Sequence, residues 1–173
     1  MRVRVVTYAP DALTRETATR MWGRFSAEQS AIRCERYDGW LGPLRARRDR
    51  FKGVLPKIEL DAPVGIADAL IVVSPLVSGR LAAPMRSFLA RPNRIPPVLG
   101  VVATCARRYP APRFEDDTER LANGFGGPET LILSRSDLGD GQDVPCGLTG
   151  FLDRLEPIVE TRLKPVVLPF LAA

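Results

Sequence analysis

Two continuous apolar runs of strand length constrain the fold of this chain more than any other feature. The first, Ala69–Val73, stops at Ser74-Pro75, and the second, Val98–Ala103, leads into Thr104. A short apolar run without alternation is typical of a strand that is buried on both faces of a sheet. Each run is followed by a loop and then by apolar residues at helical spacing, so we predict two successive strand–loop–helix units.

The same order recurs at the beginning of the chain. Arg2–Tyr8 is predicted as a strand, Ala9–Leu13 as a turn, and the following segment as a helix with Thr14 as its N-cap. We expect the core face of this helix to carry Ala18, Met21, Trp22 and Phe25. Further strands are predicted at Ala31–Tyr37, Pro97–Thr104 and Thr130–Ser134, and further helices at Leu81–Leu89, Phe114–Asn123 and Leu148–Leu163, the last kinked or interrupted at Pro157.

The segment Asp38–Pro63 carries the weakest pattern. A short helix over Leu44–Phe51 and an extended segment over Val54–Leu60 are both compatible with it. The apolar tail Val166–Leu171 is expected to pack over the body of the domain.

Alternation of strands and helices predicts a parallel sheet with helices on both faces, that is, a three-layer α/β/α sandwich. The length of 173 residues and the ordinary content of 45% hydrophobic and 26% charged residues predict a single domain over residues 1–173. Ligands of such sheets bind beyond the carboxyl ends of the strands. The rule points to the loops around Ala9, Pro75 and Cys105.

Several classes of site are excluded by composition. The chain has no histidine and only three cysteines without CxxC spacing, which excludes a Ser-His-Asp triad and argues against a zinc site and structural disulfides. We therefore predict no catalytic side chain and no metal. No apolar run approaches the roughly 20 residues of a membrane span, and the N-terminus lacks the pattern of a signal peptide, so we expect a cytoplasmic protein.

The segment Asp68–Pro75, followed by Gly79 and Pro84–Leu89, resembles the flavodoxin superfamily, including the NAD(P)H-dependent FMN reductases and quinone reductases. The resemblance extends to Val98–Cys105, similar to the fourth strand of that family, and to Tyr8 with Thr14–Glu16 at its first helix. It implies a five-stranded parallel sheet of order 2-1-3-4-5.

The resemblance also implies an FMN cofactor, with its phosphate at the first loop and its ring between the loops Ser74–Gly79 and Thr104–Arg107. Helix N-terminal amides, with the hydroxyls of Thr14 and Thr17, would bind the phosphate. The cofactor-binding residues implied in this way are Pro10, Thr14, Thr17, Ser74, Pro75, Leu76, Ser78, Gly79, Thr104, Cys105 and Ala106.

The first loop departs from the family pattern. A flavodoxin phosphate loop is rich in Ser, Thr and Gly, whereas this loop contains no glycine, Pro10 removes an amide donor, and Asp11 would repel a phosphate. Leu76 and Val77 also stand where many relatives place an aromatic residue. A flavin-free interaction or regulatory module is therefore the alternative to an FMN-dependent oxidoreductase or electron carrier that passes electrons from NAD(P)H to a quinone or another small acceptor.

The charge of the chain bears on its partners. Flavodoxin-type carriers usually have an acidic surface, so the net charge of +5 favours either a reductase or an acidic partner. Arg45–Lys52 is the densest basic run; we interpret it as a solvated helix face and not as a nucleic-acid site, with binding of an anionic polymer as a third hypothesis. Arg107 and Arg108 are interpreted as solvated, with a pyridine nucleotide phosphate as the alternative. The expected partners are thus a flavin and NAD(P)H or a redox partner, and a homodimer is left open.

Overall fold

A computed structural model describes residues 2–64, 67, 69–91, 98–106, 112–119, 128–137 and 146–163. Its centre is one sheet in which the strands lie in the order β3-β2-β1-β4-β6-β7, with β5 paired to β4. The five longer strands are parallel: β1 (Val3–Thr7), β2 (Glu28–Arg33), β4 (Ala69–Val77), β6 (Val98–Cys105) and β7 (Glu129–Ser134). The two-residue strands β3 (Glu59–Leu60) and β5 (Arg80–Leu81) pair antiparallel to their neighbours. Strand β3 falls within the extended segment expected over Val54–Leu60, whereas β5 was not predicted.

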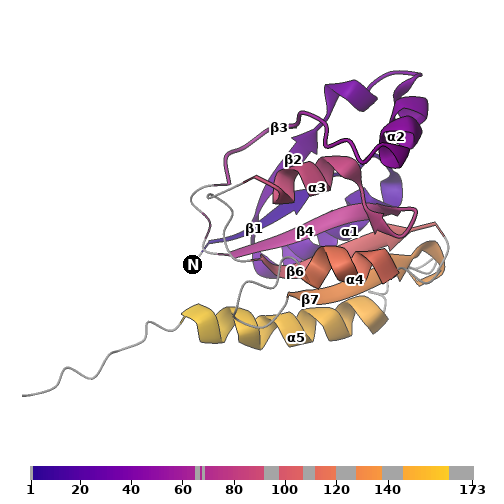
Figure 1. Ribbon diagram of the computed structural model, residues 1–173. Coiled ribbons are helices and arrows are strands. Elements are labelled where there is room, and N and C mark those ends of the chain that lie inside the picture. Colours follow the sequence, from indigo (N-terminus) through magenta and orange to yellow (C-terminus); the bar gives the residue numbers. More distant parts are fainter. Residues whose placement is uncertain are drawn as a thin grey trace, which may run out of the picture.

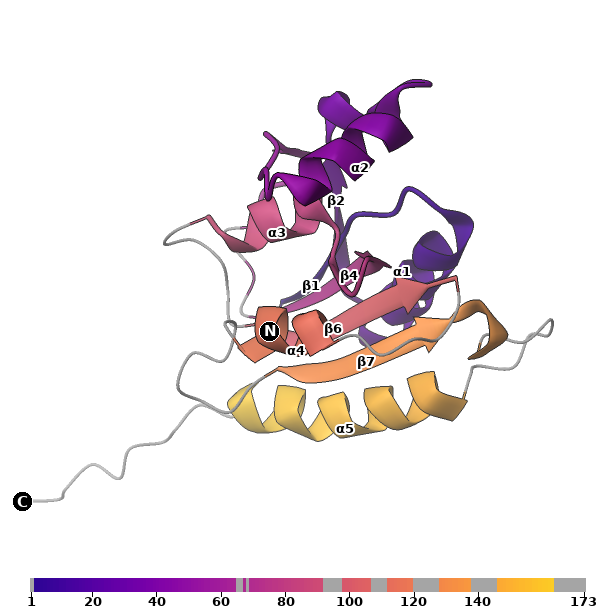
Figure 2. The same ribbon diagram turned by 45° about the vertical axis from the view of Figure 1, so that its right-hand side comes forward.

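Helices cover both faces of the sheet (Figures 1 and 2). One hydrophobic cluster joins the sheet to α1 (Ala12–Phe25) and α5 (Cys146–Leu163), and a second cluster joins the opposite face to α3 (Ala83–Leu89) and α4 (Pro112–Glu119). Helix α2 (Gly42–Phe51) lies beyond α3, after the 3-10 turn η1 (Glu35–Tyr37); a second 3-10 turn, η2 (Arg135–Asp137), follows β7. The predicted α/β/α architecture with a central parallel sheet is confirmed.

Strand β4 shows why the apolar run was informative. Ile71 and Val73 belong to the cluster under α1 and α5, whereas Leu70 and Val72 belong to the cluster under α3 and α4. All four side chains are fully buried. Burying a side chain of this size stabilises the fold by roughly 1.5–3 kcal/mol, so a strand at the centre of the sandwich needs apolar residues at consecutive positions.

The first helix differs from its prediction at two positions. It begins at Ala12 with Asp11, and not Thr14, as its N-cap, because the Asp11 carboxylate accepts a hydrogen bond from the Thr14 amide. Ala18 and Met21 are buried as predicted, but Trp22 is 47% exposed. The helix ends at Ser26 in a left-handed conformation that returns the chain to β2.

The region between β2 and β4 also differs from its prediction. The second strand begins at Glu28 and ends at Arg33, earlier than predicted, because the amide of Tyr37 bonds to the carbonyl of Cys34 and closes a 3-10 turn. The short helix near Leu44–Phe51 is present as α2, but only Glu59–Leu60 of the expected extended segment pairs as a strand.

The remaining predictions concern the C-terminal half. Helix α5 runs through Pro157 without interruption, and α4 begins at Pro112. Residues 120–123 of the predicted fourth helix, the loop residues Arg107 and Arg108, and the tail Val166–Leu171 lie outside the described residues. No helix in the described part of the chain is long and apolar enough to cross a membrane.

Candidate functional site

The three loops named from the sequence meet at one edge of the sheet. In the parallel register, Thr7 of β1 lies opposite Val73 of β4, and Pro75 of β4 lies opposite Thr104 of β6. The amide of Tyr8 continues the ladder by donating to the carbonyl of Val73 over 3.1 Å. Since parallel strands end on the same side, the loops after β1, β4 and β6 are neighbours.

The first of these loops is closed by its own side chains. The Asp11 carboxylate accepts the Thr14 amide over 2.9 Å with Oδ1 and the Thr14 hydroxyl over 2.8 Å with Oδ2. The Thr17 hydroxyl donates to the carbonyl of Leu13 over 2.9 Å. Thr14 and Thr17, the predicted phosphate donors, are both fully buried, and their hydroxyls bond within the protein.

The first loop is also tied to the third. The Thr14 and Thr104 hydroxyl oxygens are 2.6 Å apart and both side chains are buried. Cys105 follows with its thiol 3.6 Å from the carbonyl of Leu133, as part of the sheet core. Thr104 and Cys105 are buried, and Ala106 is the one exposed residue in the described part of this loop.

The second loop is a tight hairpin. Leu76 pairs with Leu81 and Val77 with Arg80 across a two-residue turn. The turn residues Ser78 and Gly79 have φ values of 55° and 76°, the conformation that suits the twist of a two-residue hairpin. The side chain of Leu76 is buried in the core, whereas Ser78 is exposed at the tip.

A cavity of about 500 Å³ lies between the first loop, this hairpin, the start of α3 and helix α2. Its size is that of a small-molecule site. The wall contains the aromatic rings of Tyr8 and Tyr37 and several prolines, Pro10, Pro43, Pro75 and Pro84. Three of the predicted residues line it, Pro10, Pro75 and Ser78, whereas Thr14, Thr17, Ser74, Leu76, Gly79, Thr104, Cys105 and Ala106 do not.

The charged residues of this cavity all carry the same sign. Arg80, Arg86 and Arg113 line it, and no carboxylate does among the described residues. The Arg86 Nε donates to the carbonyl of Leu81 over 3.1 Å, which holds this side chain at the start of α3. The cavity therefore combines an apolar and aromatic wall with a positive field, which suits a flat ligand that carries negative charge.

The two tyrosines of the wall keep their protons over the ordinary pH range. Burial, with smaller contributions from Cys34 and Asp38, raises the pKa of Tyr8 to about 12. Burial, followed by the negative charge of Asp49, raises the pKa of Tyr37 to about 12. Each phenol is therefore a neutral group at neutral pH.

The sequence indicated some of the residues that line this cavity and gave no sign of others. Tyr8 directly follows the first strand, where parallel-sheet ligands bind, and Arg80 and Arg86 lie in and after the loop that follows Ser74-Pro75. Tyr37 and Gly42 belong to the weakly patterned part of the chain, and only the folded chain brings them to the cavity.

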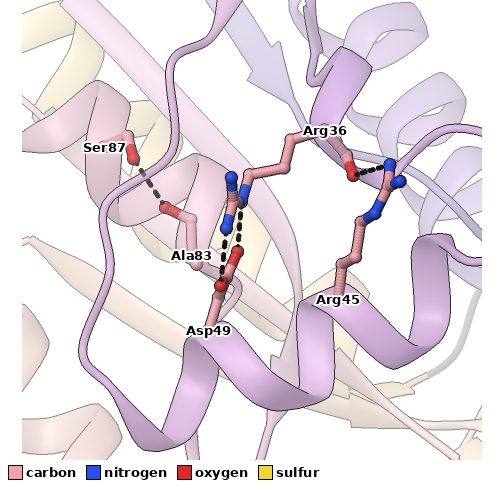
Figure 3. Close-up of polar contacts among 5 residues, drawn as sticks. All are labelled: Arg36, Arg45, Asp49, Ala83 and Ser87. Carbon is pink, nitrogen blue, oxygen red and sulfur yellow. Dashed lines mark hydrogen bonds and ion pairs between the residues drawn. The ribbon is translucent and has the colours of Figure 1, made fainter.

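A second hollow, of about 650 Å³, is lined by residues of η1, of α2 and of the segment 54–59. Arg36 of η1 lines this hollow and forms an ion pair with the buried Asp49 of α2, with Nη2 donating to Oδ1 over 2.9 Å (Figure 3). Hydrogen bonding to Arg36 lowers the pKa of Asp49. Arg45 and Arg48 of the basic run also line this hollow. Together Arg36 and Asp49 fix α2 against η1 and so place Tyr37 in the wall of the first cavity.

The structure resembles solved structures of flavoproteins. A flavoprotein from Lactobacillus acidophilus, solved in complex with FMN, superposes with a TM-score of 0.59 at 20% identity over 79% of this chain and 93% of that chain. A protein from Bacteroides eggerthii that is described provisionally as a flavoprotein gives a TM-score of 0.65 at 12% identity over 89% and 97%. A WrbA-like flavodoxin from Agrobacterium tumefaciens gives 0.53 at 11% identity over 93% and 96%.

No family model and no curated protein matches the sequence. The structural similarity covers nearly the full length of the three solved chains. The chain therefore has the flavodoxin-like fold, as the segment around Ser74-Pro75 predicted.

Proposed function

We propose that this protein is a flavin-dependent oxidoreductase that uses FMN and passes electrons from NAD(P)H to a quinone or another small acceptor. One observation carries the proposal: a cavity of about 500 Å³ lies at the carboxyl ends of β1 and β4 of a flavodoxin-like sheet. The similarity to an FMN-bound flavoprotein supports the same choice of cofactor.

The cavity wall fits the ring of a flavin. Tyr8 and Tyr37 supply aromatic surface and neutral hydroxyls, and Pro10 and Pro75 supply apolar surface. Ser78, at the tip of the hairpin, completes the set of residues that we assign to ring binding. The cofactor, when bound, supplies the redox chemistry, and the protein positions it and excludes water.

The first loop fits the phosphate less well. The hydroxyls of Thr14 and Thr17 are engaged within the protein, and the Asp11 carboxylate already accepts the Thr14 amide. Phosphate binding at α1 therefore requires Asp11 to turn away from the helix.

The arginines of the cavity support a donor or acceptor with negative charge. Arg80, Arg86 and Arg113 present guanidinium groups, which bind phosphate and carboxylate oxygens in pairs. Pyridine nucleotides carry such phosphates, so these residues favour NAD(P)H as the electron donor. We place the protein in the cytoplasm, where a reducing thiol pool would keep Cys34 and Cys105 as the free thiols of the structure.

Purification and spectroscopy test the proposal. We expect protein that has been incubated with FMN and desalted to retain an absorption band between about 350 and 500 nm, where oxidised flavin absorbs. We further expect this band to bleach on addition of NADH or NADPH and to return on addition of a quinone. Absence of the band after incubation with FMN and with riboflavin would exclude the flavoenzyme function.

A flavin-free interaction or regulatory module is the second candidate. The self-closed first loop, in which Asp11, Thr14 and Thr104 bond to one another, favours it. In that case the cavity would bind an anionic aromatic ligand without redox chemistry, and neither nicotinamide nucleotide would be oxidised by the protein.

A further inference from the structure

The N-terminus of α1 holds a carboxylate of the chain itself. Asp11 contacts Thr14 twice, through the amide at 2.9 Å and through the hydroxyl at 2.8 Å. The N-terminal amides of a helix and its positive dipole end form a favourable position for an anion. In this protein the anion at that position is the side chain of Asp11.

The contact between Asp11 and Thr14 is also supported by Thr104 of the sheet. The Thr14 hydroxyl lies 2.6 Å from the Thr104 hydroxyl at the end of β6, and both are buried. Thr14 thus connects Asp11 to the centre of the sheet. The Thr17 hydroxyl is occupied by the carbonyl of Leu13, and Pro10 has no amide proton to offer.

A phosphate at the same helix end would compete with this arrangement. It would need the Thr14 amide that Asp11 now binds, and its charge would be repelled by the carboxylate at short distance. The cavity of about 500 Å³ that we assign to the flavin ring would not repel a phosphate in this way, because the charged residues in the described part of its wall are all arginines.

We propose that Asp11 substitutes for a ligand phosphate at α1, so that this protein binds flavins through the ring and gains no affinity from the 5′-phosphate. The proposal rests on the proposed function and specifies its cofactor recognition: riboflavin and FMN bind alike, and Asp11 is the residue that sets this selectivity.

The test compares the dissociation constants of riboflavin and FMN, measured by quenching of flavin fluorescence, in the wild type and in Asp11→Gly. We expect the two constants to agree within about threefold in the wild type and to differ by at least about tenfold in favour of FMN in the variant, a gain of about 1.4 kcal/mol. Glycine is tolerated at an N-cap with a loss of only a few tenths of a kcal/mol, so the variant should fold.

Two further variants separate the effect of the Asp11 charge from the effect of its hydrogen bond to the Thr14 amide. Asp11→Asn keeps an oxygen that can cap the Thr14 amide but removes the charge, and should give an intermediate preference for FMN. Glu16→Gln removes the same charge from the same helix, at an exposed position that pairs with Arg20 and not with the cap. It should leave the ratio of the two constants unchanged.

Inorganic phosphate supplies a readout that does not depend on flavin binding. A ligand of the folded state raises the unfolding temperature. Millimolar phosphate, relative to chloride of equal ionic strength, should therefore raise the unfolding temperature of Asp11→Gly by more than it raises that of the wild type or Glu16→Gln, in which phosphate can reach only the arginines of the cavity. A wild type that prefers FMN to riboflavin by tenfold or more, or an Asp11→Gly variant without gained response to phosphate, would overturn the proposal. Phosphate stabilisation of the variant without any flavin binding would uphold the role of Asp11 and exclude the flavoenzyme.

Discussion

The loops after β1 and β4 lie side by side at the same edge of the sheet, yet they have opposite character. In the first loop the polar groups bond to one another, through Asp11, Thr14 and Thr104. The second loop is a hairpin that, with α2 and α3, encloses a cavity whose wall carries Tyr8 and Arg80. The strand order fixes which edge of the sheet can hold a ligand, whereas the side chains decide which part of that edge is open.

The largest effect is expected at Gly42, where α2 meets the cavity. A Cβ at this position would lie 1.9 Å from the carbonyl oxygen of Tyr37. We expect Gly42→Ala to lower the free energy of unfolding by about 3 kcal/mol, because backbone must move to relieve the overlap. Gly23→Ala is the matched control: a Cβ there has no neighbour within 4 Å, and helical propensity predicts a gain of up to about 1 kcal/mol. Denaturant titration measures both, and equal stabilities of the two variants would contradict the packing of α2.

The next effect concerns the closed first loop. Thr14→Val removes the hydroxyl that bonds to Asp11 and Thr104 and leaves a buried Thr104 hydroxyl without this partner. We expect a loss of about 2 kcal/mol in the free energy of unfolding. The double variant Thr14→Val with Thr104→Val should recover part of that loss, since both partners are then apolar. A double-mutant cycle with no coupling energy would show that the two loops are not joined as described.

A smaller effect is expected from the charge of the cavity. Arg113→Gln removes one exposed guanidinium from its wall, and should weaken binding of NADPH to the flavin-loaded protein by about fivefold, or about 1 kcal/mol. Added salt should reduce the difference, because the interaction is screened. Arg47 is an exposed arginine of α2 that lines neither cavity. The matched substitution Arg47→Gln should therefore leave the affinity for NADPH unchanged. Equal effects of the two substitutions would assign the change to net charge and not to the cavity.

The smallest effect is a loss of stability that is absent at neutral pH and appears only at alkaline pH. Tyr8 and Tyr37 have folded-state pKa values of about 12, against an ordinary value of 10.0 for tyrosine. A pKa that is raised by folding contributes stability below the unfolded value, so this contribution should be lost as the pH rises from about 10 to about 12. Ultraviolet titration of tyrosinate should show two delayed groups, and Tyr8→Phe should remove one of them. Titration of both near pH 10 in the folded protein would contradict their burial.

Much of the architecture could be predicted from the sequence. The run Ala69–Val73 identified the central strand because a strand covered on both faces favours apolar side chains at successive positions. The order of strands and helices then implied the sandwich, and the topology of such a sandwich placed the ligand edge at Pro75. The central strand and the sandwich are confirmed, because period and burial are properties of the local sequence, whereas the ligand edge stays a prediction.

The open and closed parts of that edge were decided by the tertiary structure. The sequence favoured Thr14 as the cap, although Asp11 takes that position, because both residue types cap helices and only the path of the chain selects between them. Tyr37 lines the cavity from η1, which an ion pair between Arg36 and Asp49 joins to α2. Contacts between residues that are far apart in the chain leave no periodic pattern. The sequence by itself therefore determined the sheet and the edge at which we propose that a ligand binds, and only the folded chain determined which side chains line the cavity at that edge.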